Sequence, residues 1–371
     1  MAISAIGIIF SNLHEENVPE LVRRRTMASI PFGGRYRVID FMLSNMINSG
    51  ITTVGLMTSN NYRSLIDHIG SGKDWDLARK DGGLILLPPF SERNDGALNN
   101  RLAAINSLRG FLSRRNEKYI VLMDCDGIAK FDIADIIAYH KKKSADVTMV
   151  TCQRAMERTN DFIAVEANED GRITDLKLAP HIHNGETVNA FVNVMVFNRK
   201  FLLNLVEDSV THGLNSFESD ILLKQINSLK IYAYSFGNYY AGIDSLPAYY
   251  KHNMELLNKE VRDELFGDRD IYTKVRDSAP SKYGENAVVK NSLISDGCTI
   301  EGTVENCILF RGVKVSKGAV VKNSIIMQDN VIGEKSSLNC VITDKNVIIS
   351  DKTTLSGSNS LPYYIPKGTR L

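Results

Sequence analysis

The sequence predicts an α/β protein in which a doubly wound, mostly parallel, Rossmann-like sheet domain precedes a parallel β-helix. Three observations lead to this fold class. Short apolar runs alternate with helical stretches up to about residue 265, a motif recurs at regular spacing after about residue 286, and 371 residues exceed what one ordinary core holds. We therefore predict domains at residues 1–265 and 286–371, joined by a polar linker at residues 266–285.

Strands and helices alternate in the first domain. Apolar runs predict strands, buried on both faces, at residues 6–10, 53–57, 119–123 and 147–150. Helical stretches lie at residues 37–48, 98–111 and 248–266, and residues 162–166 and 172–176 predict a hairpin around the turn at 168–171. Strand–helix–strand alternation requires crossover connections, so the sheet is mostly parallel and its ligand site lies beyond the carboxyl ends of its strands.

A four-residue motif repeats in the second domain. The sequence N-S-L-I at residue 291 recurs as N-C-I-L at 306, N-S-I-I at 323 and N-C-V-I at 339. Repeats of fixed period indicate a solenoid. Apolar residues also recur every six positions, for example Val288, Ile294 and Ile300, which predicts coils with three short sides. The alternative, a β-sandwich of short strands, would show two-residue alternation.

Composition and charge exclude several classes of protein. The 44 basic and 43 acidic residues give a formal charge of +1, which argues against a general binder of nucleic acid or membrane surfaces. No window approaches the roughly 20 apolar residues of a membrane helix, and residues 1–10 resemble a buried first strand more than a signal peptide. Five cysteines without a C-x-x-C pair predict neither a zinc site nor a disulfide framework, and a cytoplasmic location is expected.

The most specific stretch is residues 30–51, which read I-P-F-G-G-R-Y-R-V-I-D-F-M-L-S-N-M-I-N-S-G-I. It resembles the F-G-G-K/R-x-R-x-I-D-F-x-L-S-N-x-x-N-S-G-I block of the ADP-glucose pyrophosphorylase (glucose-1-phosphate adenylyltransferase) family. The resemblance covers essentially the whole chain and implies a nucleotidyltransferase-like domain followed by a left-handed β-helix. It also implies the family's reaction, in which ATP and glucose 1-phosphate give ADP-glucose and pyrophosphate with Mg²⁺.

Transfer at phosphorus depends on positioning and charge neutralisation, so it needs a phosphate cradle, cations and metal-binding carboxylates. The family's G-G-x-G-x-R-L cradle corresponds to residues 9–15, which contain neither glycine nor arginine. The segment ends in Glu15, whose negative charge would repel a polyphosphate. The family's R-A-K-P-A matches residues 25–29, where Arg25 is kept and Met27 replaces the lysine. Its G-T-A-D-A nucleotide loop matches residues 98–102, again without glycine.

The carboxylates and the sugar-phosphate lysine also depart from the family. Asp126 matches the family's metal-binding aspartate. Without a second ligand, Asp126 could equally well cap a following helix. The second metal ligand falls on Gly242, and Asp244 stands two residues further on, about 7 Å along an extended chain. The family's E-K-P matches residues 178–180, where only Pro180 remains. Asp126 and Asp244 are thus the vestige of a metal and nucleotide site, and no intact catalytic residue is expected.

Loss of the site within a retained scaffold resembles the non-catalytic regulatory subunits of this family. The resemblance implies that Mg²⁺ and catalysis belong to a catalytic partner, that this chain binds no cofactor for catalysis, and that the two form a heterotetramer. A homo-oligomer of this chain, an active ADP-glucose-forming transferase with a divergent site, and a scaffold without an enzyme partner remain alternatives. A β-helix acyltransferase is disfavoured because all seven histidines lie at or before His252.

Clustered arginines are candidates for binding a regulatory sugar phosphate. In the family, phosphorylated effectors bind near the F-G-G-K/R-x-R segment and between the domains, and arginine offers phosphate a bidentate fork. The candidates are Arg25, Arg35, Arg37, Arg114 and Arg115. The competing interpretation is a solvated surface with weak ion pairs. His181 and His183 form an H-x-H pair without further nearby ligands, which usually indicates a loop.

Overall fold

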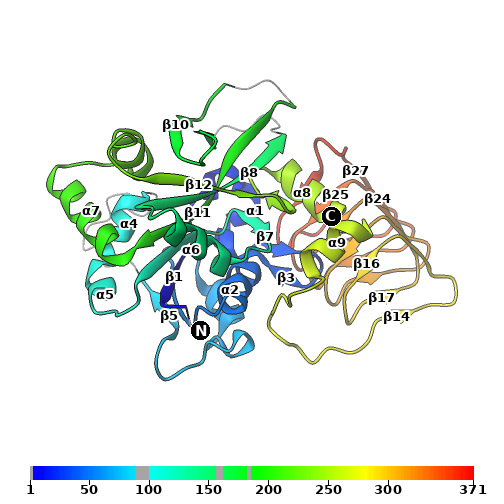
Figure 1. Cartoon of the computed structure of the whole chain (residues 1–371). Helices are drawn as coiled ribbons and strands as arrows, with labels where there is room; N and C mark the ends of the chain where they lie inside the picture. The colour runs from blue at the N-terminus through cyan, green and yellow to red at the C-terminus, as the bar shows by residue number, and fades with distance from the viewer. Residues whose placement is uncertain (1–2, 89–99, 156–161, 182–184) are drawn as a thin grey trace.

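The computed structural model describes residues 3–88, 100–155, 162–181 and 185–371. A nine-stranded sheet covered by helices on both faces forms the first part of the chain, and stacked coils form the second (Figure 1). The fold class predicted from the sequence is confirmed: a doubly wound, mostly parallel sheet domain with helices on both faces, followed by a parallel β-helix.

The central sheet has the strand order β10-β9-β11-β6-β1-β4-β5, with β8 pairing β11 and β12. Its strands are β1 (Ala5–Phe10), β4 (Thr53–Met57), β5 (Gly83–Leu87), β6 (Tyr119–Asp124), β8 (Val147–Ala155), β9 (Ile163–Ala167), β10 (Ile173–Leu178), β11 (Thr187–Asn198) and β12 (Ile231–Phe236). Strands β6, β1, β4 and β5 run parallel, whereas β11 is antiparallel to β6 and β8. The predicted hairpin is β9–β10. Every residue of β1 is buried, as its unbroken apolar run predicts.

Helices cover both faces of this sheet. They are α1 (Pro19–Val22), α2 (Val38–Asn48), α3 (Arg63–Ile69), α4 (Arg101–Ser107), α5 (Arg109–Ser113), α6 (Ile133–Lys142), α7 (Arg199–Thr211), α8 (Leu246–Glu255) and α9 (Lys259–Phe266), with a π-helix at Phe217–Leu223. Two predicted helices are shorter than expected. The stretch 248–266 divides because Asn258 caps a new helix by accepting from the Glu260 amide. The described part of 98–111 divides at Leu108.

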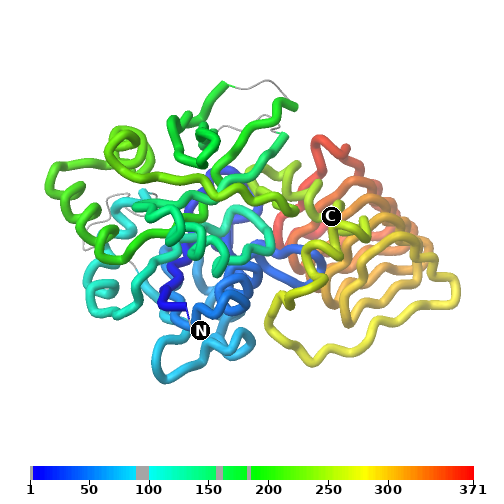
Figure 2. The backbone as a smooth tube through the Cα atoms, in the orientation of Figure 1, coloured from blue at the N-terminus to red at the C-terminus, as the bar shows by residue number. Residues whose placement is uncertain are grey.

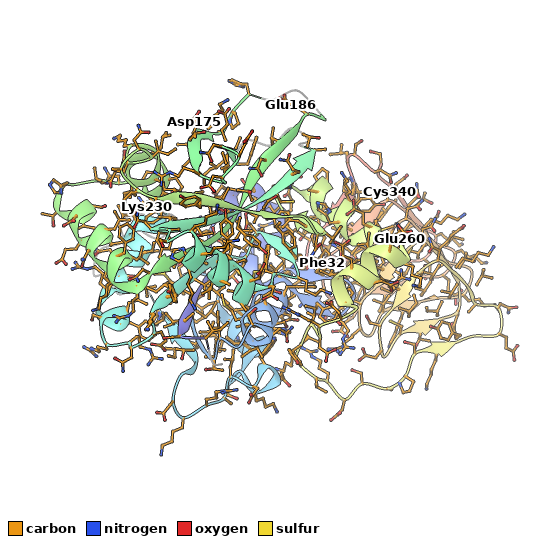
Figure 3. All side chains as sticks on the ribbon, viewed as in Figure 1. Phe32, Asp175, Glu186, Lys230, Glu260 and Cys340 are labelled. Atoms are coloured by element: carbon orange, nitrogen blue, oxygen red, sulfur yellow. The ribbon has the colours of Figure 1, made fainter. Side chains whose placement is uncertain are left out.

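The two faces of the sheet enclose separate apolar clusters. Ile9 belongs to one, with α2 and part of the β-helix, whereas Ile6 and Ile8 belong to the other, with α4 and α7. Figure 3 shows Phe32 inside the molecule and Lys230 and Glu260 at its surface. Both faces of β1 are thus buried under other elements, so β1 is a central strand of the domain core.

The second domain winds in coils that Figure 2 shows from yellow to red. Each side is a five-stranded parallel sheet. One consists of β14 (Lys282–Tyr283), β17 (Thr299–Ile300), β20 (Lys314–Val315), β23 (Val331–Ile332) and β26 (Ile348–Ile349). The next consists of β15 (Val288–Lys290), β18 (Thr303–Glu305), β21 (Val320–Lys322), β24 (Ser337–Asn339) and β27 (Thr354–Ser356). The third consists of β16 (Leu293–Ile294), β19 (Ile308–Leu309), β22 (Ile325–Ile326), β25 (Val341–Thr343) and β28 (Tyr363–Ile365).

An asparagine ladder stabilises one corner of the coils. Asn291, Asn306 and Asn323 have positive φ, a conformation that asparagine tolerates better than most residues. Their side chains hydrogen-bond from coil to coil and end on Asn339. The sequence alignment of the last repeat was wrong by one residue. Ile342 pairs with Ile325 rather than Ile326, because Ile342 joins Ile325 in the apolar cluster that faces the sheet domain.

Apolar packing and a buried ion pair join the two domains. Ile308, Phe310 and Ile325 of the coils belong to the same buried cluster as α2 and β1. Arg25 donates from Nη2 to both carboxylate oxygens of Asp344 at 2.5 and 2.7 Å, and both side chains are buried. The predicted domain boundaries at residues 265 and 286 remain predictions; the first coil strand is β14. No helix in the described ranges is long and apolar enough to span a membrane.

We predict that Asp344→Ala lowers the free energy of unfolding by about 3–5 kcal/mol, because it leaves the buried guanidinium of Arg25 without a counter-ion. Chemical denaturation of the full chain measures this. The matched control is Glu305→Ala, which breaks the exposed pair with Lys322 and leaves stability nearly unchanged. Equal losses in the two variants would contradict a special role for the buried pair.

Candidate functional site

A cavity of about 440 Å³ opens at the carboxyl edge of the sheet. Its walls come from the loop after β1, the segment after β6, the end of β8, α4, the π-helix and the loop after β13 (Tyr240–Gly242). Asp126 and Asp244 both line it. The volume falls within the range of small-molecule sites, and its place fits the rule for open α/β sheets.

The loop after β1 is folded on its own side chains. The Asn12 amide nitrogen donates to Glu15 at 2.7 Å, and the Asn12 carbonyl oxygen accepts from the Ser59 amide at 2.9 Å. His14 has a positive φ of 65° and is followed by a short 3-10 helix. Burial raises the pKa of Glu15 to about 6 against the opposing hydrogen bond from Asn12. A turn held by side chains therefore stands where the family has a glycine-rich cradle.

Two cations share the buried carboxylate of Asp124. His14 Nε2 lies 2.9 Å and Arg101 Nη2 lies 2.7 Å from Asp124 Oδ2. Arg101 Nε also lies 2.8 Å from Glu218 of the π-helix. Burial by itself lowers the pKa of His14, but its hydrogen bond to Asp124 and the charges of Asp126 and Asp124 outweigh burial and raise that pKa to about 9. His14 is consequently protonated at neutral pH.

Asp126 is held by an amide. Asn193, a residue of β11 with a φ of 56°, donates from Nδ2 to Asp126 Oδ2 at 2.6 Å. Removal from water raises the pKa of Asp126 despite the charge of His14 and this hydrogen bond, and the charge of Asp124 adds to the rise. The Asn193 amide therefore occupies an oxygen of Asp126 that a metal ion would use.

Position 242 lies beside Asp126 but offers no ligand. Strand β13 pairs antiparallel with β7 (Gly127–Ala129), so that Gly242 lies opposite Gly127, the neighbour of Asp126. The guanidinium of Arg154 covers Gly242 and donates to Asp244 Oδ2 at 3.1 Å. The described ranges contain no group of three His, Cys, Asp or Glu side chains that could hold a metal. These side chains do not fit the Mg²⁺ that the family resemblance implies.

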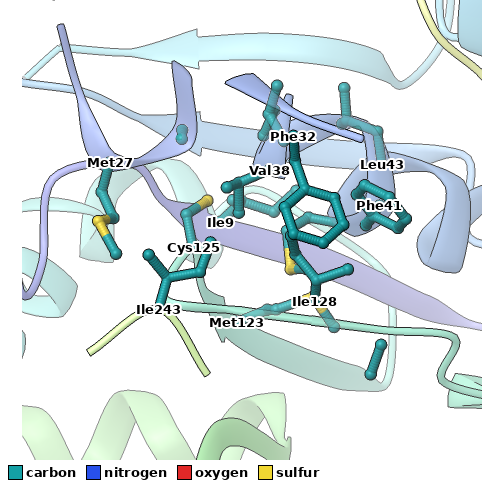
Figure 4. Close-up of a cluster of buried hydrophobic side chains, with 14 of the residues drawn as sticks. Ile9, Met27, Phe32, Val38, Phe41, Leu43, Met123, Cys125, Ile128 and Ile243 are labelled. Atoms are coloured by element: carbon teal, nitrogen blue, oxygen red, sulfur yellow. The ribbon is translucent and has the colours of Figure 1, made fainter. Parts of the chain in front are cut away.

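Apolar side chains stand at other positions that match charged residues of the family's site. Met27 is fully buried and lies in the cluster with Cys125 and Ile243 that Figure 4 shows. Leu178 and Ala179, which stand for the family's carboxylate and lysine, line the cavity. Residues 98 and 99 of the predicted nucleotide loop lie outside the described residues. At this end of the cavity the described chain presents Asn100 and Arg101.

The structure brings two of the effector candidates together at the domain junction. Arg37 is buried and donates to the Ser64 carbonyl, and its charge acts on both Arg25 and Lys345. Burial and the charges of Arg37 and Arg25 lower the pKa of Lys345 to about 6, against the attraction of Asp344. Among the described residues, Nη1 of Arg25 is buried without a hydrogen-bond partner.

The remaining candidates lie apart from this junction. Arg35 is exposed and lies 5.6 Å from the ring centre of Tyr36. Arg114 and Arg115 follow α5, on the side of the sheet domain away from the coils (Figure 1), where Arg115 lies 3.7 Å from Glu117. His181 is exposed, and His183 lies outside the described residues.

Sequence analysis missed four charged residues that shape these sites. They are His14, Arg101, Arg154 and Lys345. His14 and Arg101 lie in the segments matched to the family's cradle and nucleotide loop, whereas Arg154 and Lys345 lie outside every matched segment. Their contacts join residues as distant in sequence as Arg154 and Asp244. One signal was available: Gly242 at a ligand position indicates that another side chain fills the space.

A family model described as nucleotidyl transferase matches residues 19–259 of the chain. The chain belongs to the nucleotidyl transferase family. A second model, described as the GlmU-like, C-terminal hexapeptide, matches residues 278–360, in agreement with the β-helix.

Comparison with individual proteins shows which members of the family this chain is similar to. The chain is 33% identical over 364 residues to the glycogen biosynthesis protein GlgD of Bacillus subtilis (strain 168), covering 98% of this chain and 96% of that protein. It is 34% identical over 332 residues to a glucose-1-phosphate adenylyltransferase of Clostridium perfringens (strain SM101 / Type A), covering 88% and 85%. A Bacillus anthracis enzyme of that name is 32% identical over 341 residues, covering 90% of each chain. The family recognised from residues 30–51 is thus confirmed.

We predict that His14 keeps its proton at pH 8, because its folded pKa of about 9 exceeds the ordinary value of 6.5. The stabilisation by His14 is complete below pH 6.5 and is lost as the pH rises through about 9, where Asp124 and Asp126 face a neutral ring. An NMR titration of the ring measures the pKa. Denaturation of His14→Gln tests the linkage, since this variant should lack that loss of stability; a ring that titrates near 6.5 would contradict the prediction.

Proposed function

We propose that this chain is a non-catalytic regulatory subunit of glucose-1-phosphate adenylyltransferase in glycogen biosynthesis, which modulates a catalytic subunit by hetero-oligomerisation. One observation supports it above the others: the carboxylates of the pocket are occupied by the chain's own cations and amide. His14 and Arg101 take Asp124, Asn193 takes Asp126, and Arg154 takes Asp244. Similarity to GlgD over nearly the whole chain supports the pathway.

Charge in the pocket supports the absence of turnover. A phosphoryl-transfer site offers unpaired cations to phosphates and unpaired carboxylates to a metal. Here Arg101 and Arg154 each pair with carboxylates, and the side chains at positions 27, 178 and 179 are apolar. Loss of one preorganised donor commonly lowers a rate by about 10²–10³, and several are replaced here.

We further propose that the cations at the domain junction bind a sugar-phosphate effector. Arg25, Arg37 and Lys345 meet there, and within the described ranges Asp344 is the carboxylate that pairs with Arg25. A phosphate arriving at this point would meet guanidinium groups and would draw a proton onto Lys345, whose pKa burial and the neighbouring cations hold low. Because Arg25 belongs to the sheet domain and Lys345 to the coils, a phosphate bound to both would change the interaction between the two domains.

We predict that the purified chain alone makes no ADP-glucose from ATP and glucose 1-phosphate with Mg²⁺, and that co-expression with a catalytic homologue gives a complex with altered kinetics. A sensitive product assay and a mass measurement of the complex test this. Asp126→Ala is the control for contamination. Product that disappears with Asp126→Ala would establish the alternative, an active transferase with a divergent site.

We predict that Lys345→Ala and Arg37→Ala each raise the sugar-phosphate concentration for half-maximal activation of the assembled complex by about ten-fold or more, because each removes a charge-assisted contact. Arg115→Ala is the matched control, since it removes an arginine that lies outside the junction. An activation curve that is unchanged in Lys345→Ala and Arg37→Ala, or equally shifted by Arg115→Ala, would contradict the assignment.

A further inference from the structure

Position 242 is restricted by one side chain and not by its backbone. Gly242 does not have a positive φ, so its backbone accepts an L-residue. A Cβ built there would lie 2.3 Å from Arg154 Nη2 and 2.8 Å from Cζ and Nη1. The three nearest atoms all belong to the guanidinium of Arg154. This guanidinium therefore takes the space that a side chain at position 242 would occupy.

Arg154 is fixed in this place by two contacts. Its Nη2 donates to Asp244 Oδ2 at 3.1 Å, and its Cζ lies 5.1 Å from the ring centre of Tyr240. Tyr240 and Gly242 belong to β13, which pairs with β7, and Ile243 N donates to the Asp126 carbonyl at 2.7 Å. The ladder holds position 242 next to Asp126, and Arg154, Asp126 and Asp244 line the same cavity.

We propose that the guanidinium of Arg154 takes the place of a metal-binding side chain at position 242 and holds Asp244 as its counter-ion. This inference deepens the proposed function and rests on it, since it names the residue that keeps a divalent cation out. It also predicts that Arg154 and position 242 are coupled. A carboxylate at 242 builds a metal site only after Arg154 is removed.

Binding of Mn²⁺ alone to the full chain tests the proposal, because Mn²⁺ takes carboxylate ligands and is detected by electron paramagnetic resonance without any turnover. We expect no binding by the wild type and weak or no binding by Gly242→Asp. The double variant Arg154→Ala with Gly242→Asp should bind about ten-fold or more tightly than Gly242→Asp, as for residues in direct contact. Addition of Asp126→Asn should abolish that gain.

Arg172 provides the matched control. Its guanidinium also lies on a tyrosine ring, 5.7 Å from the centre of Tyr232, and it is not among the residues that line the cavity. Arg172→Ala combined with Gly242→Asp should bind no better than Gly242→Asp alone. Three results would overturn the proposal. They are Mn²⁺ binding by the wild type that depends on Asp126, equal gains in Mn²⁺ affinity from Arg172→Ala and Arg154→Ala, and no gain in affinity from Arg154→Ala.

A measurement on the unaltered chain applies if the double variant does not fold. The Nε–H resonance of Arg154, assigned by its loss in Arg154→Lys, should not move when Mg²⁺ is added, since the guanidinium remains on Asp244. A shift that shows its displacement by Mg²⁺ would overturn the proposal. A chain that makes no ADP-glucose but binds Mn²⁺ at Asp126 would refute this inference and leave the proposed function standing, so the two fail separately.

Discussion

A carboxylate withdrawn from water requires a partner, and this constraint organises the carboxyl edge of the sheet. Asp124 is buried at the end of β6, with His14 and Arg101 on one of its oxygens. Breaking such a pair on one side leaves an uncompensated charge, which is far costlier than breaking an exposed pair. The loop after β1, helix α4 and the π-helix are held through this single carboxylate, since Arg101 continues to Glu218.

The same constraint accounts for an ordered pocket that lacks several of the side chains on which the family's chemistry relies. A sheet of this topology leaves a hollow at the ends of its strands whatever side chains line it. In a catalytic relative, metal and substrate would neutralise the carboxylates there. Here histidine and arginine side chains of the chain itself pair with Asp124 and Asp244, and the Asn193 amide hydrogen-bonds Asp126.

The fold was predictable from the sequence because its signals are local or periodic. Residues 6–10 form a buried strand, the turn at 168–171 joins a hairpin, and the repeated asparagine motif marks the coil corners. Local signals failed where two patterns compete. Asn258 caps a new helix inside an apolar stretch, and the motif at 339 suggested a register one residue away from the one that apolar packing selects.

The candidate site was predictable only in part, since motifs reveal which residues are missing and not what replaces them. The sequence showed glycine at 242 and methionine at 27. It did not show that Arg154, from the end of a different strand, fills the first gap, or that the second is filled by apolar packing with Cys125. Such replacements come from chain segments that meet only in the folded molecule.

The apolar cluster that Ile308, Phe310 and Ile325 share with the sheet domain bears on how the whole chain denatures. Separating the coils from the sheet would leave these side chains in water on one part and their partners in water on the other. The shared cluster therefore couples the two parts, and heat should melt both in one cooperative step. A fragment ending at the linker would expose this apolar surface and would tend to aggregate.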